Sequence, residues 1–170
     1  YMNTGTQRSS ASPAGAITST TPVLSKLQHK KNMIGIIEAH RIPYIATASP
    51  AFPLDLFDKV KTASDTVGSR YMEGHAPCPP GWGFPNKDLI KMGKLAVDSG
   101  IHVLFEIVDG AFRLTSRSLS LAEKGNRKPV ADYVKGQTRF KKISPEQIDA
   151  LQKFVDVRWN EFLERQNKNS

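Results

Sequence analysis

The pattern of apolar and polar residues alternates between short apolar runs and stretches of helical period. Residues 44–48 are apolar and partly β-branched, which is typical of a strand covered on both faces. Further strands are predicted over residues 69–75 and 101–108. After the last of these, an Asp-Gly pair predicts a turn into a short strand over residues 112–115.

Helices are predicted where apolar residues recur three and four positions apart. These segments lie near residues 31–41, from 53 to about 67, from 86 to 100, and from 144 through at least 162. The second has an apolar stripe that we expect to face the core, made of Leu56, Phe57, Val60, Ala63 and Val67. The last has the clearest start, because Ser144 and Gln147 form a capping box around Pro145.

Strands that alternate with helices of about 10 to 15 residues favour right-handed βαβ units. The sequence therefore predicts an α/β fold of three layers, in which a mostly parallel sheet is flanked by helices. We expect residues 1–115 to form this domain, with an ordered loop over residues 1–30. We expect residues 116–170 to form a basic extension and a C-terminal helix that packs on the same domain or on a partner subunit. Within this region, residues 116–142 show little periodicity and predict an irregular excursion.

Positive charge is concentrated in one segment of this 170-residue chain, whose formal net charge is +8. Between residues 113 and 142, Glu123 and Asp132 stand against a larger basic set: Arg113, Arg117, Lys124, Arg127, Lys128, Lys135, Arg139, Lys141 and Lys142. Such a segment could meet nucleic acid, a membrane surface or an acidic protein. It lacks the interleaved aromatic residues of a nucleic-acid stacking surface and any recognition-helix pattern, so we expect no nucleic-acid partner.

The number of cysteines and the hydropathy of the chain indicate the cellular compartment. The single cysteine excludes an internal disulfide framework and suits a reducing compartment, so we expect a cytoplasmic protein. No apolar run approaches the roughly 18 residues that a membrane span needs, and we expect no membrane partner.

Two groups of residues could carry chemistry. In Asn3, Thr4 and Gly5, the Asn side chain offers hydrogen-bond donors and an acceptor, and the glycine lets backbone amides approach a diphosphate. The tripeptide fits either a phosphate-bearing cofactor or a plain turn. Cys78 lies between two prolines that restrict its loop, and its thiol fits either a metal ligand or an inert buried group. The nearby His75 is expected to be a structural residue rather than a ligand.

Two motifs carry a family resemblance. The first is Tyr1-Met-Asn-Thr-Gly-Thr-Gln-Arg-Ser-Ser10, and the second is His75-Ala-Pro-Cys-Pro-Pro-Gly-Trp-Gly-Phe84. Shorter matching segments lie at 30–33, 42–49, 52–56, 127–130 and 158–159. Taken in this order, they resemble the thiamine-diphosphate-binding β subunit of pyruvate and branched-chain 2-oxoacid:ferredoxin oxidoreductases, over nearly the whole chain.

The resemblance implies a fold and a set of site residues. It implies that this chain is the C-terminal part of a subunit with the thiamine-diphosphate-binding fold, whose N-terminal part is missing here. Asn3 would lie at the reacting carbon, with Thr4 and Gly5 also beside thiamine diphosphate. Cys78 would be one of four ligands of a 4Fe-4S cluster. The other three thiolates and most magnesium ligands would come from outside this chain, so the chain alone would be inactive.

The reaction that the resemblance implies is oxidative decarboxylation of pyruvate or a related 2-oxoacid to acyl-coenzyme A. Electrons would pass through the iron–sulfur cluster to ferredoxin. The expected partners are the other subunits of the complex, ferredoxin, coenzyme A and the 2-oxoacid. Three alternatives stay open: specificity for branched-chain 2-oxoacids, a noncatalytic assembly subunit, and a noncatalytic basic binding module.

Overall fold

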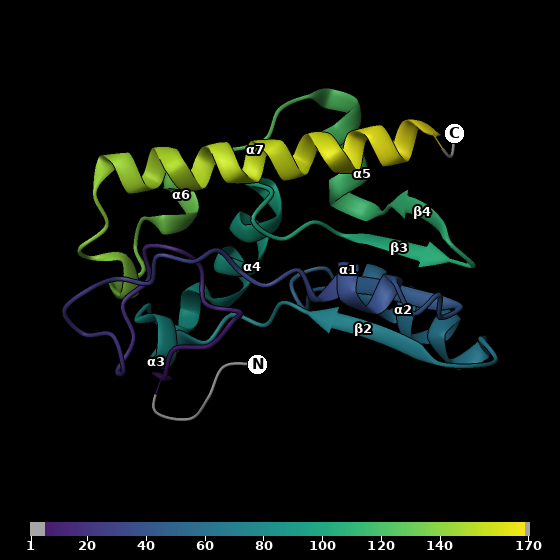
Figure 1. The fold of residues 1–170 in the computed structure, drawn as a ribbon, viewed down its shortest axis with the longest axis horizontal. Coiled ribbons are helices and arrows are strands. Elements are labelled where there is room, and N and C mark those ends of the chain that lie inside the picture. The colour runs from purple at the N-terminus through teal and green to yellow at the C-terminus, as the bar shows by residue number, and fades with distance from the viewer. Residues whose placement is uncertain (1–5, 169–170) are drawn as a thin grey trace.

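The computed structural model describes residues 6–168 and arranges them as one sheet flanked by helices (Figure 1). The strands are β1 (Tyr44–Ala48), β2 (Arg70–Gly74), β3 (Phe105–Val108) and β4 (Ala111–Leu114), in the order β2-β1-β3-β4 across the sheet. The α-helices are α1 (Met33–Glu38), α2 (Pro53–Asp65), α3 (Pro79–Trp82), α4 (Leu89–Asp98), α5 (Ser116–Lys124), α6 (Val130–Val134) and α7 (Pro145–Lys168), and the 3-10 helices include η2 (Asn86–Asp88) and η3 (Thr138–Phe140). The predicted α/β class, with a helix at the C-terminal end, is confirmed.

The sheet is mixed rather than mostly parallel. Strands β1 and β2 pair in parallel, whereas β1 with β3 and β3 with β4 pair antiparallel. The start of β3 is tied to the end of β1, because the Thr47 hydroxyl donates to the Val103 carbonyl oxygen at 2.6 Å and accepts from the Phe105 amide at 3.0 Å. Strand β4 then follows a tight turn in which Asp109 and Gly110 have positive φ angles of 48° and 85°.

The two faces of the sheet differ in chemistry. Side chains alternate between the faces along each strand. On one face, Ile45, Phe105 and Ile107 belong to an apolar core that also contains residues of α1, α5 and α7. On the other face, the buried Tyr44 hydroxyl donates to the buried carboxylate of Glu106 at 2.9 Å. Helix α2 packs beside β1, where this polar pair lies.

The apolar stripe predicted for α2 does not face the core. Phe57 and Val60 on the helix are 67% and 51% exposed, and Val67 beyond its end is 92% exposed. Lys59 is the buried residue of this helix, with 2% of its surface exposed. The stripe fails because the sheet face beneath α2 is polar, which the spacing of residues along the helix does not reveal.

Buried Lys59 is fully provided with hydrogen-bond acceptors. Its Nζ donates to the Thr47 carbonyl oxygen and the Asp55 carboxylate, both at 2.8 Å, and to the Thr115 hydroxyl at 2.7 Å. Burial lowers the pKa of Lys59, and the neighbouring Asp55 opposes that shift. The ion pair with Asp55, four residues earlier, lies within α2, and the hydrogen bonds to Thr47 and Thr115 link this helix to the end of β1 and to the segment after β4.

Helix α7 is the longest helix of the described residues and begins as predicted. The Ser144 amide donates to Gln147 Oε1 at 3.0 Å, and the Gln147 amide donates to Ser144 Oγ at 3.2 Å, so the capping box is confirmed. Figure 1 shows α7 running along one side of the molecule, past α6 and α5. Among residues 6–168, no helix is long and apolar enough to cross a membrane.

The region predicted as an irregular excursion contains α5, α6 and η3, whose few turns give too short a pattern to read as periodic. Basic residues between 113 and 142 also pair with acidic residues elsewhere in the chain. Arg113 pairs with Glu106, Arg127 with Asp156, and Arg117 and Lys128 both pair with Asp98. The concentration of positive charge seen along the sequence is therefore partly neutralised in the fold.

We expect Lys59→Met to lower the free energy of unfolding by about 3–5 kcal/mol, because it leaves the buried Asp55 carboxylate without its cation. Denaturant titration measures the loss. Lys61→Met on the same helix is the matched control, since Lys61 is exposed, and should change stability by no more than about 0.5 kcal/mol. The double change Asp55→Leu with Lys59→Met should recover most of the loss. Equal stability of the two lysine variants would contradict the role given to Lys59.

Candidate functional site

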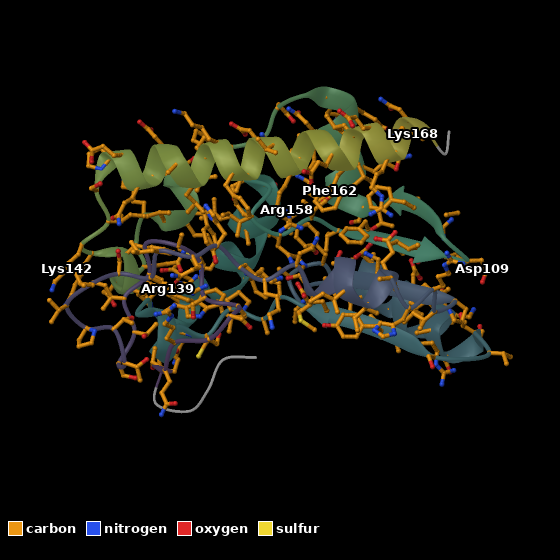
Figure 2. The ribbon with its side chains drawn as sticks, in the orientation of Figure 1. Asp109, Arg139, Lys142, Arg158, Phe162 and Lys168 are labelled. Atoms are coloured by element: carbon orange, nitrogen blue, oxygen red, sulfur yellow. The ribbon has the colours of Figure 1, made fainter. Side chains whose placement is uncertain are left out.

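A cavity of about 270 Å³ lies where the N-terminal loop, the end of β2 and α7 come together. Its wall includes the segments 11–14 and 29–34. Figure 2 labels three further residues of the wall: Arg139 from η3, and Arg158 and Phe162 from α7. Its ionisable and thiol-bearing residues are His29, Lys30, Lys31, Glu73, His75, Cys78, His102, Tyr133, Arg139 and Arg158. The cavity thus gathers residues that are far apart in sequence.

Cys78 lies in the wall of this cavity, four residues beyond β2. It is the N-cap of α3, whose first residue Pro79 has the fixed φ that a helix start needs. Its side chain is a free thiol and packs against a small apolar cluster of Trp82, Phe84 and Met92. The strand end and the proline therefore hold the thiol at one place in the cavity wall.

The turn after α3 is locked to η3. Gly83 ends the helix in the left-handed region, with φ 70°, and a Cβ at this position would lie 1.7 Å from Thr138 Oγ1. The Thr138 amide also donates to the Gly83 carbonyl oxygen at 3.0 Å. Glycine is required here for both its backbone angles and the close approach. The contact fixes Arg139, the next residue of η3, relative to the cysteine loop.

Arg139 is a buried cation that has neutral partners. It is 7% exposed. Its Nε donates to Gln137 Oε1 and its Nη2 to the Tyr133 hydroxyl, both at 2.8 Å. The guanidinium carbon lies 3.9 Å from the centre of the Trp82 ring, a cation–π contact. The ion pairs found among residues 6–168 do not include Arg139.

Two histidines stack beside this arginine. The rings of His75 and His102 lie 5.0 Å apart, and His102 Nε2 donates to the Ala48 carbonyl oxygen at 3.0 Å. Burial and the positive charge of Arg139 lower the pKa of His75 to about 3. Burial, followed by the neighbouring His75, holds the pKa of His102 well below its usual range. Both imidazoles are therefore uncharged at neutral pH.

Three buried polar atoms of the described residues that line the cavity have no hydrogen-bond partner: Glu73 Oε2, His75 Nδ1 and Trp82 Nε1. The other carboxylate oxygen of Glu73 pairs with Lys30. Unsatisfied buried groups are uncommon in folded proteins and cost free energy when they stay dry. Their gathering in one cavity indicates a place that water or another polar group can fill.

At the α7 side of the cavity, Arg158 presents its guanidinium to aromatic rings. Its central carbon lies 5.9 Å from the centre of Phe154 and 5.5 Å from that of Phe162. Burial lowers the pKa of Arg158. Together with Arg139, this residue gives the cavity a positive character, since the one carboxylate in its wall, that of Glu73, is engaged by Lys30.

The residues predicted from the sequence fall into two groups. Asn3, Thr4 and Gly5 lie outside the described residues, so their placement stays a prediction. Cys78 is part of the cavity wall, and His75 is another residue of that wall. Residues 6–168 contain no group of three or more His, Cys, Asp or Glu side chains able to hold a metal ion. Arg139 was missed, because in the sequence it is one of nine basic residues of a segment that reads as solvated.

No protein-family model matches the chain. Curated proteins do match it. Pyruvate synthase subunit PorB of Methanothermobacter thermautotrophicus is 43% identical over 160 residues, which cover 92% of this chain and 54% of that protein. Ketoisovalerate oxidoreductase subunit VorB of Pyrococcus horikoshii is 42% identical over 163 residues, with 94% and 51% covered. Subunit PorB of Thermotoga maritima is 37% identical over 172 residues, with 96% and 51% covered.

The chain spans about half the length of the curated relatives it matches. The identity extends over nearly the whole of the chain, as the motifs at both ends of it led us to expect. The resemblance predicted from the sequence is thereby confirmed. Over nearly its whole length, this chain is similar to part of the pyruvate synthase and ketoisovalerate oxidoreductase subunits PorB and VorB, which supports a 2-oxoacid:ferredoxin oxidoreductase β subunit.

Proposed function

We propose that this chain is part of the β subunit of an enzyme that oxidatively decarboxylates pyruvate or a related 2-oxoacid to acyl-coenzyme A. Electrons would leave through an iron–sulfur cluster to ferredoxin. The observation that carries the proposal is the 37–43% identity to PorB and VorB subunits over more than nine-tenths of the chain. We place the enzyme in the cytoplasm, where a reducing environment preserves thiolate ligands.

Cys78 is the ligand that we propose for the 4Fe-4S cluster. Its side chain fits that role in three respects: it is a free thiol, it lies in a cavity wall, and its loop is restrained by two prolines. A cluster takes four such ligands, and this chain has one cysteine. The remaining thiolates would come from the other part of the complete subunit. Trp82 and Phe84, both buried, pack against the half-buried thiol and cover part of it.

For thiamine diphosphate we propose Asn3, Thr4 and Gly5. When bound, this cofactor supplies the carbanion chemistry that decarboxylation of a 2-oxoacid requires. The role of Asn3 would be to donate a hydrogen bond from its amide to the substrate at the reacting carbon, and Gly5 would let the backbone approach the diphosphate. The magnesium that accompanies a diphosphate prefers carboxylate oxygens, which we assign to residues outside this chain.

The relatives bear on the substrate and on the rival functions. Subunits named for pyruvate and for ketoisovalerate match at 43% and 42% identity, so a substrate assay must include both 2-oxoacids.

A basic binding module is less favoured, because Arg113, Arg117, Arg127 and Lys128 all pair with acidic residues of the chain itself. An acidic partner surface, such as that of ferredoxin, would meet the remaining lysines of this segment.

The complete oxidoreductase with Cys78→Ser should lose much of its cluster, because a hydroxyl is a poorer ligand for iron than a thiolate. Iron content per subunit and the electron paramagnetic resonance signal of the reduced enzyme measure the loss. Ala76→Ser, which adds a hydroxyl to the same loop and leaves the thiol in place, should retain the cluster. The 170-residue chain alone should bind no iron. A full complement of cluster in the Cys78→Ser enzyme would show that the ligand is elsewhere.

Asn3→Ala in the complete oxidoreductase should lower kcat about 100-fold and leave the melting temperature unchanged, because it removes a hydrogen bond that matters as charge develops in the transition state. Assays with pyruvate and 2-oxoisovalerate follow turnover, and calorimetry follows folding. Asn160→Ala, at an exposed position of α7, is the control and should keep full activity. Activity of the Asn3 variant equal to that of the control would remove Asn3 from the site.

A further inference from the structure

We infer that Arg139 is a positioning residue that raises the reduction potential of the cluster bound by Cys78, by placing a permanent positive charge beside its ligand. The inference rests on the proposed role of Cys78 and concerns a residue that no part of that proposal uses. It follows from the burial of Arg139, from its uncharged partners and from the contacts that join η3 to the cysteine loop.

The burial of this charge calls for a counter-charge. A guanidinium stays protonated in proteins, and burying it without an anionic partner is costly. Arg139 is 7% exposed, and the two side chains that accept its hydrogen bonds, Gln137 and Tyr133, are both neutral. By contrast, four arginines of residues 6–168 pair with a carboxylate: Arg113, Arg117, Arg127 and Arg165. A neutral cage therefore leaves the positive charge of Arg139 available to an anion in the cavity.

Arg139 is linked to Cys78 through Trp82 and through the contact between η3 and α3. The Arg139 guanidinium stacks on the Trp82 ring. Trp82 belongs to the group of apolar side chains against which the Cys78 side chain packs. Trp82 and Cys78 are the last residue and the N-cap of the same four-residue helix. The Gly83–Thr138 contact clamps that helix to η3. Burial lowers the pKa of Arg139, and Cys78 is among the groups that oppose that shift.

The other charges of the cavity wall are balanced, exposed to solvent or placed on another element, and Lys31 is one of the exposed ones. His75 and His102 are neutral at neutral pH, as their lowered pKa values require. Lys30 and Glu73 form an ion pair and largely cancel. Arg158 is the second cation of the cavity, and it lies on α7 against Phe154 and Phe162 rather than against the cysteine loop. Arg139 is thus the cation that shares a neighbour, Trp82, with the ligand.

A cluster held by four thiolates is anionic and becomes more so on reduction. A fixed positive charge in a low-dielectric site stabilises the reduced state more than the oxidised one, and so raises the potential. This is the same physical effect by which hydrogen bonds and net charge tune iron–sulfur centres. The cluster would in turn provide the negative charge that Arg139 lacks among the described residues.

The test is a redox titration of the complete oxidoreductase, with the midpoint potential of the cluster followed by electron paramagnetic resonance. Arg139→Gln should make reduction at least 10-fold less favourable, a shift of about 59 mV to more negative potential for one electron. Arg139→Lys, which keeps the charge, should stay closer to the parent. Gln137→Glu should shift the potential in the same direction as Arg139→Gln, because it gives the arginine a carboxylate partner while the stacking on Trp82 is kept.

Arg158→Gln is the matched control, since it removes the same charge from the other side of the same cavity, and its shift should be smaller. If Arg139→Gln fails to retain a cluster, Gln137→Glu decides the matter alone. Unchanged potentials in Arg139→Gln and Gln137→Glu would overturn the inference, as would an equal shift in Arg158→Gln. Failure of the proposed function looks different: the Cys78→Ser enzyme would then keep its cluster, whatever the Arg139 variants show.

Discussion

The structure depends on the way α7 buries residues in two separate cores. Leu151 and Val155, in its first half, pack with residues of α4 and α6, and Trp159 and Phe162, further along, pack with the apolar face of the sheet. The same helix supplies part of the cavity wall between these cores. Helix α7 thus fixes the position of the sheet relative to the small helices. The cavity lies beside α7, where this helix passes from one core to the other.

The cavity is held by local contacts as well as by this long helix. The cysteine loop follows directly after strand β2, and Pro79 starts the single helical turn of α3. The close approach of Gly83 and Thr138 joins that turn to η3. Each of these contacts involves few residues, but each restricts the conformations that the cysteine loop can adopt. A cysteine that binds an iron–sulfur cluster together with ligands from another part of a subunit benefits from such restraint. The loop then loses little conformational entropy when the cluster binds.

Local features of the sequence predicted the fold where the deciding contacts are local. The capping box of Ser144 and Gln147 and the fully buried strand β1 are confirmed, because each is set by neighbouring residues. The direction of β3 was not predictable, since Thr47 acts on Val103 from 56 residues away. The buried face of α2 also could not be predicted, because a lysine at the right spacing reads as solvent-facing until the polar face beneath it is known.

At the site, the sequence identified Cys78 through its motif but gave no sign of Arg139, whose surroundings are assembled by the fold. The thiol of Cys78 is also the sole one in the chain, and it is half-buried at the junction of α3 with the cavity. A spin or fluorescent label attached to sulfur would therefore report from this junction and from nowhere else in these 170 residues. The chain thus has a single natural labelling site, from which the mobility of the cysteine loop can be measured.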